Sequence, residues 1–190
     1  MKKLFCQLLA LVMLTAMLLG ILTGCKRNPR VVFEIENYGK IVMELRPEVA
    51  PLTVANFQKL VEEGFYDGLT FHRIDDLTHQ GGYIIQGGDP DGDGTGGSGT
   101  PIKGEFSSNG VTNNLSHVRG VVSMARTNDP NSATSQFFIC AGDCSFLDGN
   151  YAAFAVVVRG MRVVDKLAAV RVDENSKPLE EIVITKAYMK

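Results

Sequence analysis

The acidic stretch that begins at Asp89 is the first place where residue type and spacing suggest chemistry. The carboxylates of Asp89, Asp91 and Asp93, followed by Gly94, open like a calcium-binding loop of the D-x-D-x-D-G type, in which such oxygens surround a hard cation. The twelfth position is Thr100, where the loop needs a bidentate glutamate. A calcium-dependent surface adhesin is therefore a weak alternative, and we expect a solvated acidic turn with no metal.

The glycine-rich run that follows matches a nucleotide-binding fingerprint by accident. Gly94 to Gly99 fits G-x-G-x-x-G, but it leads into Thr100 and Pro101 and not into a helix whose N-terminus could hold a pyrophosphate. The formal net charge is −2 and no run of basic residues is present. Because phosphate binding needs clustered lysine and arginine, we expect no nucleic-acid partner.

Reactive side chains elsewhere do not assemble into a hydrolytic site. The sequence has no G-x-S-x-G elbow, and its three histidines have no evident serine or cysteine partner. The 21 acidic residues are scattered over the chain and single out no carboxylate pair for glycosidase chemistry. These observations exclude the common hydrolase patterns.

The four cysteines separate by context. Cys6 lies inside an apolar N-terminal run and Cys25 lies at its end, which leaves Cys140 and Cys144, too few for a zinc site. Cys140 closes an apolar run, whereas Cys144 lies in a Gly-Asp loop. Their separation does not forbid a disulfide, but we treat both as thiols.

The N-terminus has the order of an export signal, because Lys2 and Lys3 precede an apolar run that ends in small residues. Leu22-Thr23-Gly24-Cys25 resembles a bacterial lipoprotein signal, in which the cysteine becomes the lipid-bearing first residue; an uncleaved membrane anchor is the alternative. We predict a signal peptide at residues 1–24, a lipidated Cys25 with a tether to residue 30, and a domain at residues 31–190. The domain would be exported and lipid-anchored at the extracytoplasmic face of the cell membrane.

The elements that must position any site are many short strands and two helices. Apolar and polar residues alternate over residues 31–36 and 40–45, which predicts a β-hairpin. Helical spacing predicts helices over residues 51–64 and 161–169. Further strands are expected at residues 69–74, 83–86, 121–125, 136–140, 153–158 and 182–187. Because closure removes exposed strand edges, this pattern favours a closed or nearly closed β-barrel.

Five separated segments resemble, in order, the signature segments of the cyclophilin-type peptidyl-prolyl isomerases. They are Phe71-His72-Arg73-Ile74, Ile84-Ile85-Gln86-Gly87-Gly88-Asp89-Pro90, Ser123-Met124-Ala125, Ser135-Gln136-Phe137-Phe138-Ile139 and Phe146-Leu147-Asp148-Gly149. The resemblance implies a mostly β fold with two helices, a closed eight-stranded antiparallel β-barrel capped by the helices. It also implies isomerisation of X-Pro bonds without a cofactor or metal, proline-containing peptides and folding proteins as partners, and a monomer.

The resemblance assigns roles to individual side chains. Arg73 would aim guanidinium donors at the twisted amide, Gln86 would orient the arginine, and Phe138 would form part of the proline pocket. The other residues that match the family's substrate groove are Tyr83, Ile84, Ala125, Gln136, Phe146, Leu147 and Tyr151. His72 should point to the face opposite Arg73, since neighbours on a strand alternate, and we expect His117 to be structural.

One segment departs from the family pattern in its length. The link from Asp75 to Tyr83 is longer than the usual turn, which predicts a surface bulge beside the groove. A proline-peptide-binding module without turnover is the main alternative, and the joint presence of Arg73, Gln86 and Phe138 disfavours it. The sequence therefore predicts an isomerase that acts on X-Pro bonds of extracytoplasmic proteins during folding.

Overall fold

The computed structural model describes residues 27–190, so the predicted signal peptide and the predicted lipidation site at Cys25 lie outside the described residues. Within residues 27–190, no helix combines the length and apolarity that a bilayer crossing requires.

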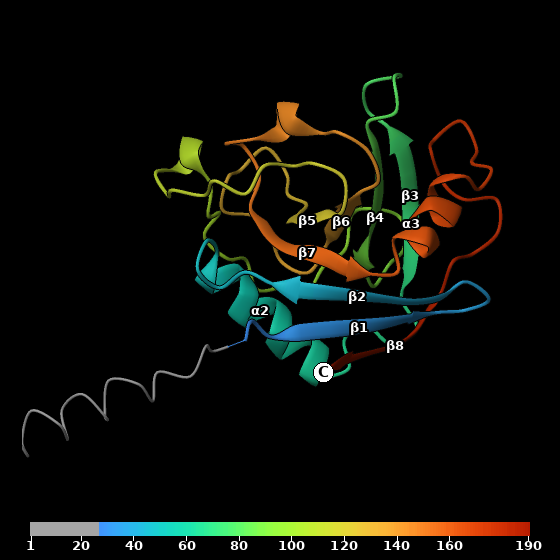
Figure 1. The fold of residues 1–190 in the computed structure, drawn as a ribbon, viewed down its shortest axis with the longest axis horizontal. Coiled ribbons are helices and arrows are strands. Elements are labelled where there is room, and N and C mark those ends of the chain that lie inside the picture. The colour runs from blue at the N-terminus through green and yellow to red at the C-terminus, as the bar shows by residue number, and fades with distance from the viewer. Residues whose placement is uncertain (1–26) are drawn as a thin grey trace, which may run out of the picture.

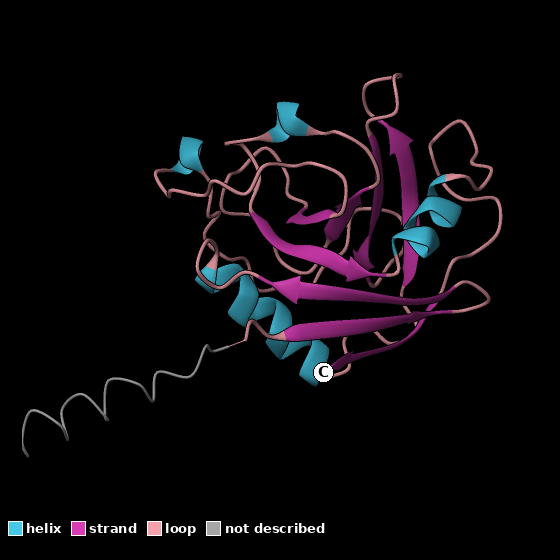
Figure 2. Cartoon of the chain, viewed as in Figure 1, coloured by secondary structure: helices cyan, strands magenta, loops and turns pink. Residues whose placement is uncertain are grey.

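Eight antiparallel strands form one curled sheet, and every strand predicted from the sequence is present (Figures 1 and 2). The strands are β1 (Arg30–Ile35), β2 (Gly39–Leu45), β3 (Thr70–Asp76), β4 (Tyr83–Asp89), β5 (Val121–Met124), β6 (Phe137–Cys140), β7 (Ala153–Arg159) and β8 (Ile184–Met189). Their order in the sheet is β3-β4-β6-β5-β7-β2-β1-β8. Strands from the middle of the chain therefore lie together at one end of the sheet.

The sheet is open where the sequence predicted a closed barrel. Its end strands β3 and β8 do not form a ladder; a single bridge joins Thr70 to Val183, with backbone hydrogen bonds around it such as Phe71 N–H to the Ile182 carbonyl, 3.0 Å. The contact joins the beginnings of the two strands, and because it is antiparallel, β3 and β8 run away from each other on either side of it. Closure is therefore not confirmed, although the curl brings the two ends into contact.

Two α-helices pack beside the sheet, as predicted, on opposite sides of it in the view of Figure 1. Helix α2 (Pro51–Glu62) begins at a proline, which suits the first helical turn, and Gly64 with φ of 70° ends the run. It packs against β8, whereas α3 (Met161–Ala168) packs against β2, β3 and β4. Two short 3₁₀ helices, η1 (Ser107–Asn109) and η2 (Ser145–Leu147), lie in the loops.

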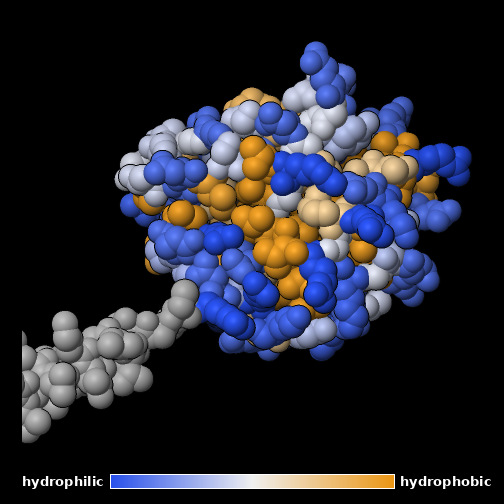
Figure 3. Space-filling view, in the orientation of Figure 1, coloured by the Kyte–Doolittle hydropathy of each residue, from blue (hydrophilic) through white to orange (hydrophobic). Residues whose placement is uncertain are grey.

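The core between sheet and helices is built on buried aromatic rings. The ring centroids of Phe57 and Phe154 lie 4.8 Å apart, and those of Phe33 and Phe137 lie 5.5 Å apart with their planes at 70°, both within the range of favourable aromatic pairs. On the outside, apolar side chains gather in the middle of one face over β7 and β2, with hydrophilic residues around them (Figure 3). The rigid core fixes the strands that carry the candidate site.

Candidate functional site

An open cavity of about 400 Å³ lies at the β3-β4-β6 end of the sheet. Its lining mixes apolar and aromatic side chains with two arginines and one amide. The lining residues are Arg73, Leu77, Ile84, Gln86, Ala125, Arg126, Phe138, Phe146, Leu147 and Tyr151. A concave site lined mostly by apolar and aromatic residues, with a few polar groups, is typical of a ligand site.

Strand register brings three of these side chains into one row. Arg73 on β3 is the pairing partner of Gln86 on β4, and Gln86 is the partner of Phe138 on β6. Partners directly opposite on adjacent strands have neighbouring side chains on the same face of the sheet. A cation, an amide and an aromatic ring therefore stand side by side across three strands.

A chain of hydrogen bonds holds the polar members of this row. The Arg73 guanidinium donates from Nη2 to the Asp75 carboxylate, 2.5 Å, and from Nη1 to Gln86 Oε1, 3.4 Å. Gln86 Nε2 donates to Gln136 Oε1 at 2.8 Å, and Gln136 Nε2 donates to the backbone carbonyl of Gly96 at 2.8 Å. The side chain of Arg73 is 40% exposed, so it can meet a ligand while its orientation is fixed.

Ile84, Phe138 and Leu147 form an apolar wall of the cavity. His117 supports this wall from behind. Its ring stacks on Phe138 with centroids 6.0 Å apart and planes 19° apart. His117 is buried, with Nδ1 2.8 Å from the Asp148 carboxylate and Nε2 2.9 Å from Ser123 Oγ. Burial lowers the pKa of the His117 imidazole, although the hydrogen bond and charge of Asp148 oppose this. His117 therefore acts as the structural residue that the sequence indicated, and it holds Phe138 in place.

Cys140 and Cys144 are free thiols, both buried, and they pack with Ile84 and Phe138 behind the cavity. A hydrogen bond with Cys144, together with burial, raises the pKa of the Cys140 thiol. Both side chains thus serve as small buried groups that support the wall from behind.

A second cavity of about 320 Å³ adjoins the first. The two cavities share Gln86, Ala125 and Arg126. The remaining lining of the second cavity is made of glycines, hydroxyl residues and one amide: Gly94, Thr95, Gly96, Gly97, Gly99, Thr127, Ser132, Thr134 and Gln136. A peptide lying across the first cavity would therefore continue over a surface made of hydroxyl groups and of the exposed backbone of glycines.

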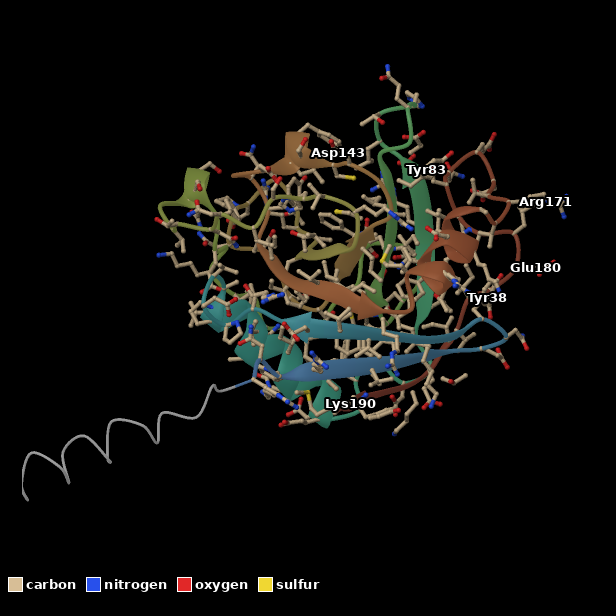
Figure 4. The ribbon with its side chains drawn as sticks, viewed as in Figure 1. Tyr38, Tyr83, Asp143, Arg171, Glu180 and Lys190 are labelled. Atoms are coloured by element: carbon tan, nitrogen blue, oxygen red, sulfur yellow. The ribbon has the colours of Figure 1, made fainter. Side chains whose placement is uncertain are left out.

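Eight of the ten site residues predicted from the sequence line the first cavity: Arg73, Gln86, Phe138, Ile84, Ala125, Phe146, Leu147 and Tyr151. Gln136 lines the second. Tyr83 lines neither cavity and is 38% exposed, so the structure does not bring it together with the other predicted groove residues. Since strand neighbours point to opposite faces, Ile84 and Tyr83 cannot both face the cavity. Figure 4 shows Tyr83 at the end of the molecule where Asp143 also lies.

Two lining residues were missed by the sequence analysis. Leu77 lies in the long link after β3, which had been recognised as a bulge beside the groove but not as part of the wall. Arg126 directly follows the matched segment that ends at Ala125. Its position next to that segment could have indicated that Arg126 also lines the cavity.

In the acidic stretch only Asp89 is buried, whereas Asp91 and Asp93 are exposed. The carboxylate of Asp89 is buried and accepts backbone N–H bonds from Asp91, Asp93 and Gly94, the last at 2.6 Å. Within residues 27–190, no group of three or more His, Cys, Asp or Glu side chains is arranged to hold a metal ion. His72 lines a different cavity from Arg73, beside Asp89, but the register of β3 against β4 shifts between Phe71 and Arg73, so regular strand alternation is not the cause of this placement.

Comparison with known proteins extends these observations to nearly all of the described chain. Residues 30–189 match the model of the family described as cyclophilin type peptidyl-prolyl cis-trans isomerase/CLD. The chain is 41% identical over 150 residues to peptidyl-prolyl cis-trans isomerase ppi1 of Schizosaccharomyces pombe, covering 78% of this chain and 92% of that protein. It is 43% identical over 136 residues to peptidyl-prolyl cis-trans isomerase B of Bacillus subtilis, covering 72% and 88%.

A solved structure has the same fold. The crystal structure of a Cryptosporidium parvum cyclophilin type peptidyl-prolyl cis-trans isomerase, determined in the presence of the dipeptide Ala-Pro, superposes with a TM-score of 0.75 and 32% identity. The superposition covers 85% of this chain and 98% of that one. The curled sheet and its two helices are therefore those of a known architecture.

Proposed function

The chain belongs to the cyclophilin-type peptidyl-prolyl cis-trans isomerases, and from this premise we propose that Arg73, Gln86 and Phe138 form its catalytic centre and that its clients are extracytoplasmic proteins. The isomerase activity follows from the family. The roles of the individual residues and the location of the clients are our proposal.

The reaction breaks no bond. Partial double-bond character in the C–N bond sets a barrier of about 18–20 kcal/mol, which makes an uncatalysed X-Pro isomerisation take tens of seconds or longer. At the barrier the amide is twisted and the prolyl nitrogen regains its lone pair. An isomerase must therefore bind the twisted amide more strongly than either planar form.

Arg73 is suited to stabilise that state. Its guanidinium is held by Asp75 and Gln86 but is partly exposed to the cavity, so it can donate to the prolyl nitrogen or to a neighbouring carbonyl. Its charge persists at any relevant pH. Because its orientation is fixed before the ligand arrives, little reorganisation is needed when the amide twists.

The apolar wall holds the proline ring while the bond rotates. Phe138 and Ile84 are buried in the wall, and Leu147 on η2 completes it. Gln86, fixed by Gln136, is placed to contact the client backbone beside the ring. The Ala-Pro dipeptide named with the related parasite structure supports a proline in this wall.

The observation that carries the assignment is the row of Arg73, Gln86 and Phe138 across three strands. We expect Arg73→Ala to leave the circular dichroism spectrum unchanged and to lower kcat/KM on a proline tetrapeptide by about a hundredfold or more, in line with the loss of a preorganised donor. Arg30→Ala is the matched control, because Arg30 lies on β1, pairs with Glu44 and lines neither cavity. Near wild-type turnover by a folded Arg73→Ala enzyme would refute the catalytic role.

The extracytoplasmic location rests on the N-terminal sequence. Leu22-Thr23-Gly24-Cys25 supports lipidation of Cys25, and a doubly acylated residue is enough for stable anchoring. Cys25→Ser should abolish metabolic labelling with a fatty acid and move the protein out of the detergent phase, while the isomerase activity is retained. Labelling that survives the substitution would contradict the proposal.

A further inference from the structure

We propose that Arg126 makes this isomerase prefer clients that carry an acidic residue one or two positions before the proline. The inference rests on the proposed binding of the proline ring against Phe138. It adds a specificity-determining residue that the family resemblance did not assign.

Arg126 is held rigidly between the two cavities. Its Nε and Nη2 donate to the backbone carbonyl of Asn150 at 3.0 and 2.8 Å, and Nη1 donates to the carbonyl of Thr127 at 2.8 Å. The guanidinium carbon also lies 4.6 Å from the ring centroid of Tyr151 and 5.2 Å from that of Phe106, both cation-π distances. These contacts leave two of its five N–H groups unused.

The charge of Arg126 is not neutralised by the protein. Within residues 27–190, no carboxylate lies within ion-pair distance of it, whereas Arg73, the other charged residue that lines the cavities, is paired with Asp75. All of the partners of Arg126 are neutral carbonyls and aromatic rings. A fixed cation without a counter-charge, at the junction of two substrate-sized cavities, is complementary to a carboxylate on the ligand.

The nearby acidic residues do not fill this role. Asp93 bonds to the backbone N–H and hydroxyl of Thr95, and Asp129 accepts the backbone N–H of Asn131. The Asp89 carboxylate is buried in its own turn. No acidic side chain lines either cavity, so a client carboxylate would face Arg126 without a like charge beside it.

The length of an extended peptide determines which client residue can reach Arg126, and it favours a residue that precedes the proline. The residue before a proline is biased to an extended conformation, and each residue spans roughly 3.3–3.6 Å. With the ring against Phe138 and the X-Pro bond beside Gln86, the preceding residues continue toward the second cavity, which shares Gln86, Ala125 and Arg126 with the first. Side chains one or two positions before the proline then lie next to Arg126.

The test compares matched peptides that differ only in charge. We would measure kcat/KM for Glu-Ala-Pro-Phe against Gln-Ala-Pro-Phe, and for Ala-Glu-Pro-Phe against Ala-Gln-Pro-Phe, at pH 7 by a protease-free assay. For a partly exposed ion pair we expect a Glu/Gln ratio of about two to five at one of the two positions in low salt, falling toward one in high salt. Arg126→Gln should remove the preference, and Arg30→Gln, which changes the net charge equally, should retain it.

Two results would overturn the inference: a ratio of one at both positions in the wild type, or a ratio that Arg126→Gln leaves unchanged. Either is distinct from failure of the proposed catalytic centre, because the glutamine peptides report turnover by themselves. Should turnover be absent, the same peptide pairs can be compared by their dissociation constants, and equal constants for Glu and Gln peptides would equally contradict the role of Arg126.

Discussion

Replacing Glu105 with glutamine tests how helix α2 is anchored to the rest of the fold. The residue before the helix is Ala50, which provides no side-chain cap. Instead, the buried carboxylate of Glu105 accepts the backbone N–H of Leu52 at 3.0 Å and both the N–H and the hydroxyl of Thr53 at 2.8 and 2.7 Å. The negative charge also lies at the positive end of the helix dipole.

The expected cost follows from these three bonds. The two carboxylate oxygens face donors on both sides, so an amide at residue 105 must direct its NH₂ group at another donor. One charge-assisted bond is lost and the others become neutral, which at about 1.5–3 kcal/mol for a bond to a charged group gives a destabilisation of about 2–4 kcal/mol. For a domain of this size, the melting temperature should fall by roughly 5–15 °C.

Urea unfolding followed by circular dichroism measures this difference, with an unchanged m-value as the sign that only stability has changed. Glu62→Gln is the matched control, since Glu62 is an exposed residue of the same helix, and we expect it to remain within about 0.5 kcal/mol of the wild type. If Glu105→Gln were as stable as this control, the reasoning that a distant carboxylate caps α2 would be refuted.

Three further outcomes are expected. Tyr83→Ala should keep kcat/KM on a proline peptide within about twofold of wild type, whereas Ile84→Ala should lower it at least tenfold, because only Ile84 lines the cavity. The free energy of unfolding should fall as the pH is lowered from 7.5 to 5. Burial lowers the pKa of His72 and of His117 in the folded protein, so the unfolded chain takes up their protons first, near pH 6.5. Chemical denaturation should show a smaller fall in His72→Gln. Gly142→Ala should lower the melting temperature, since a Cβ at that residue would overlap the backbone carbonyl of Gly81.

Local patterns were enough to predict the helices and strands. Pro51 and Gly64 fix the two ends of α2 by backbone preference alone, and alternation predicts the β1-β2 hairpin. The edges of the sheet could not be predicted in this way. Whether β3 and β8 form a ladder depends on the register in which the two strands meet, here at their beginnings, and tertiary packing sets that register rather than the composition of either strand.

Site residues could be predicted from the sequence where they lie together in one short segment. They were missed where their role depends on contacts between residues far apart in the chain. Glu105 lies 53 residues from Leu52, and no local spacing indicates that it caps the helix. Arg126 is visible as a charge in the sequence, but its lack of a carboxylate partner depends on Asn150, Tyr151 and Phe106. Tyr83 is the opposite case, because strand alternation from Ile84 was sufficient to exclude it from the wall.

Which aromatic ring of β6 faces the cavity depends on strand register. Phe137 and Phe138 are adjacent, and all four residues of β6 are buried, so burial along the strand does not distinguish its two faces. The pairing of Gln86 with Phe138 directs Phe138 to the cavity, while Phe137 packs with Phe33 and Phe57 in the core. A slip of one residue between β4 and β6 would exchange the two rings and move the apolar wall away from Arg73. The catalytic row therefore depends on the same core packing that keeps Phe137 inside, and changes in that core should alter turnover without touching the cavity.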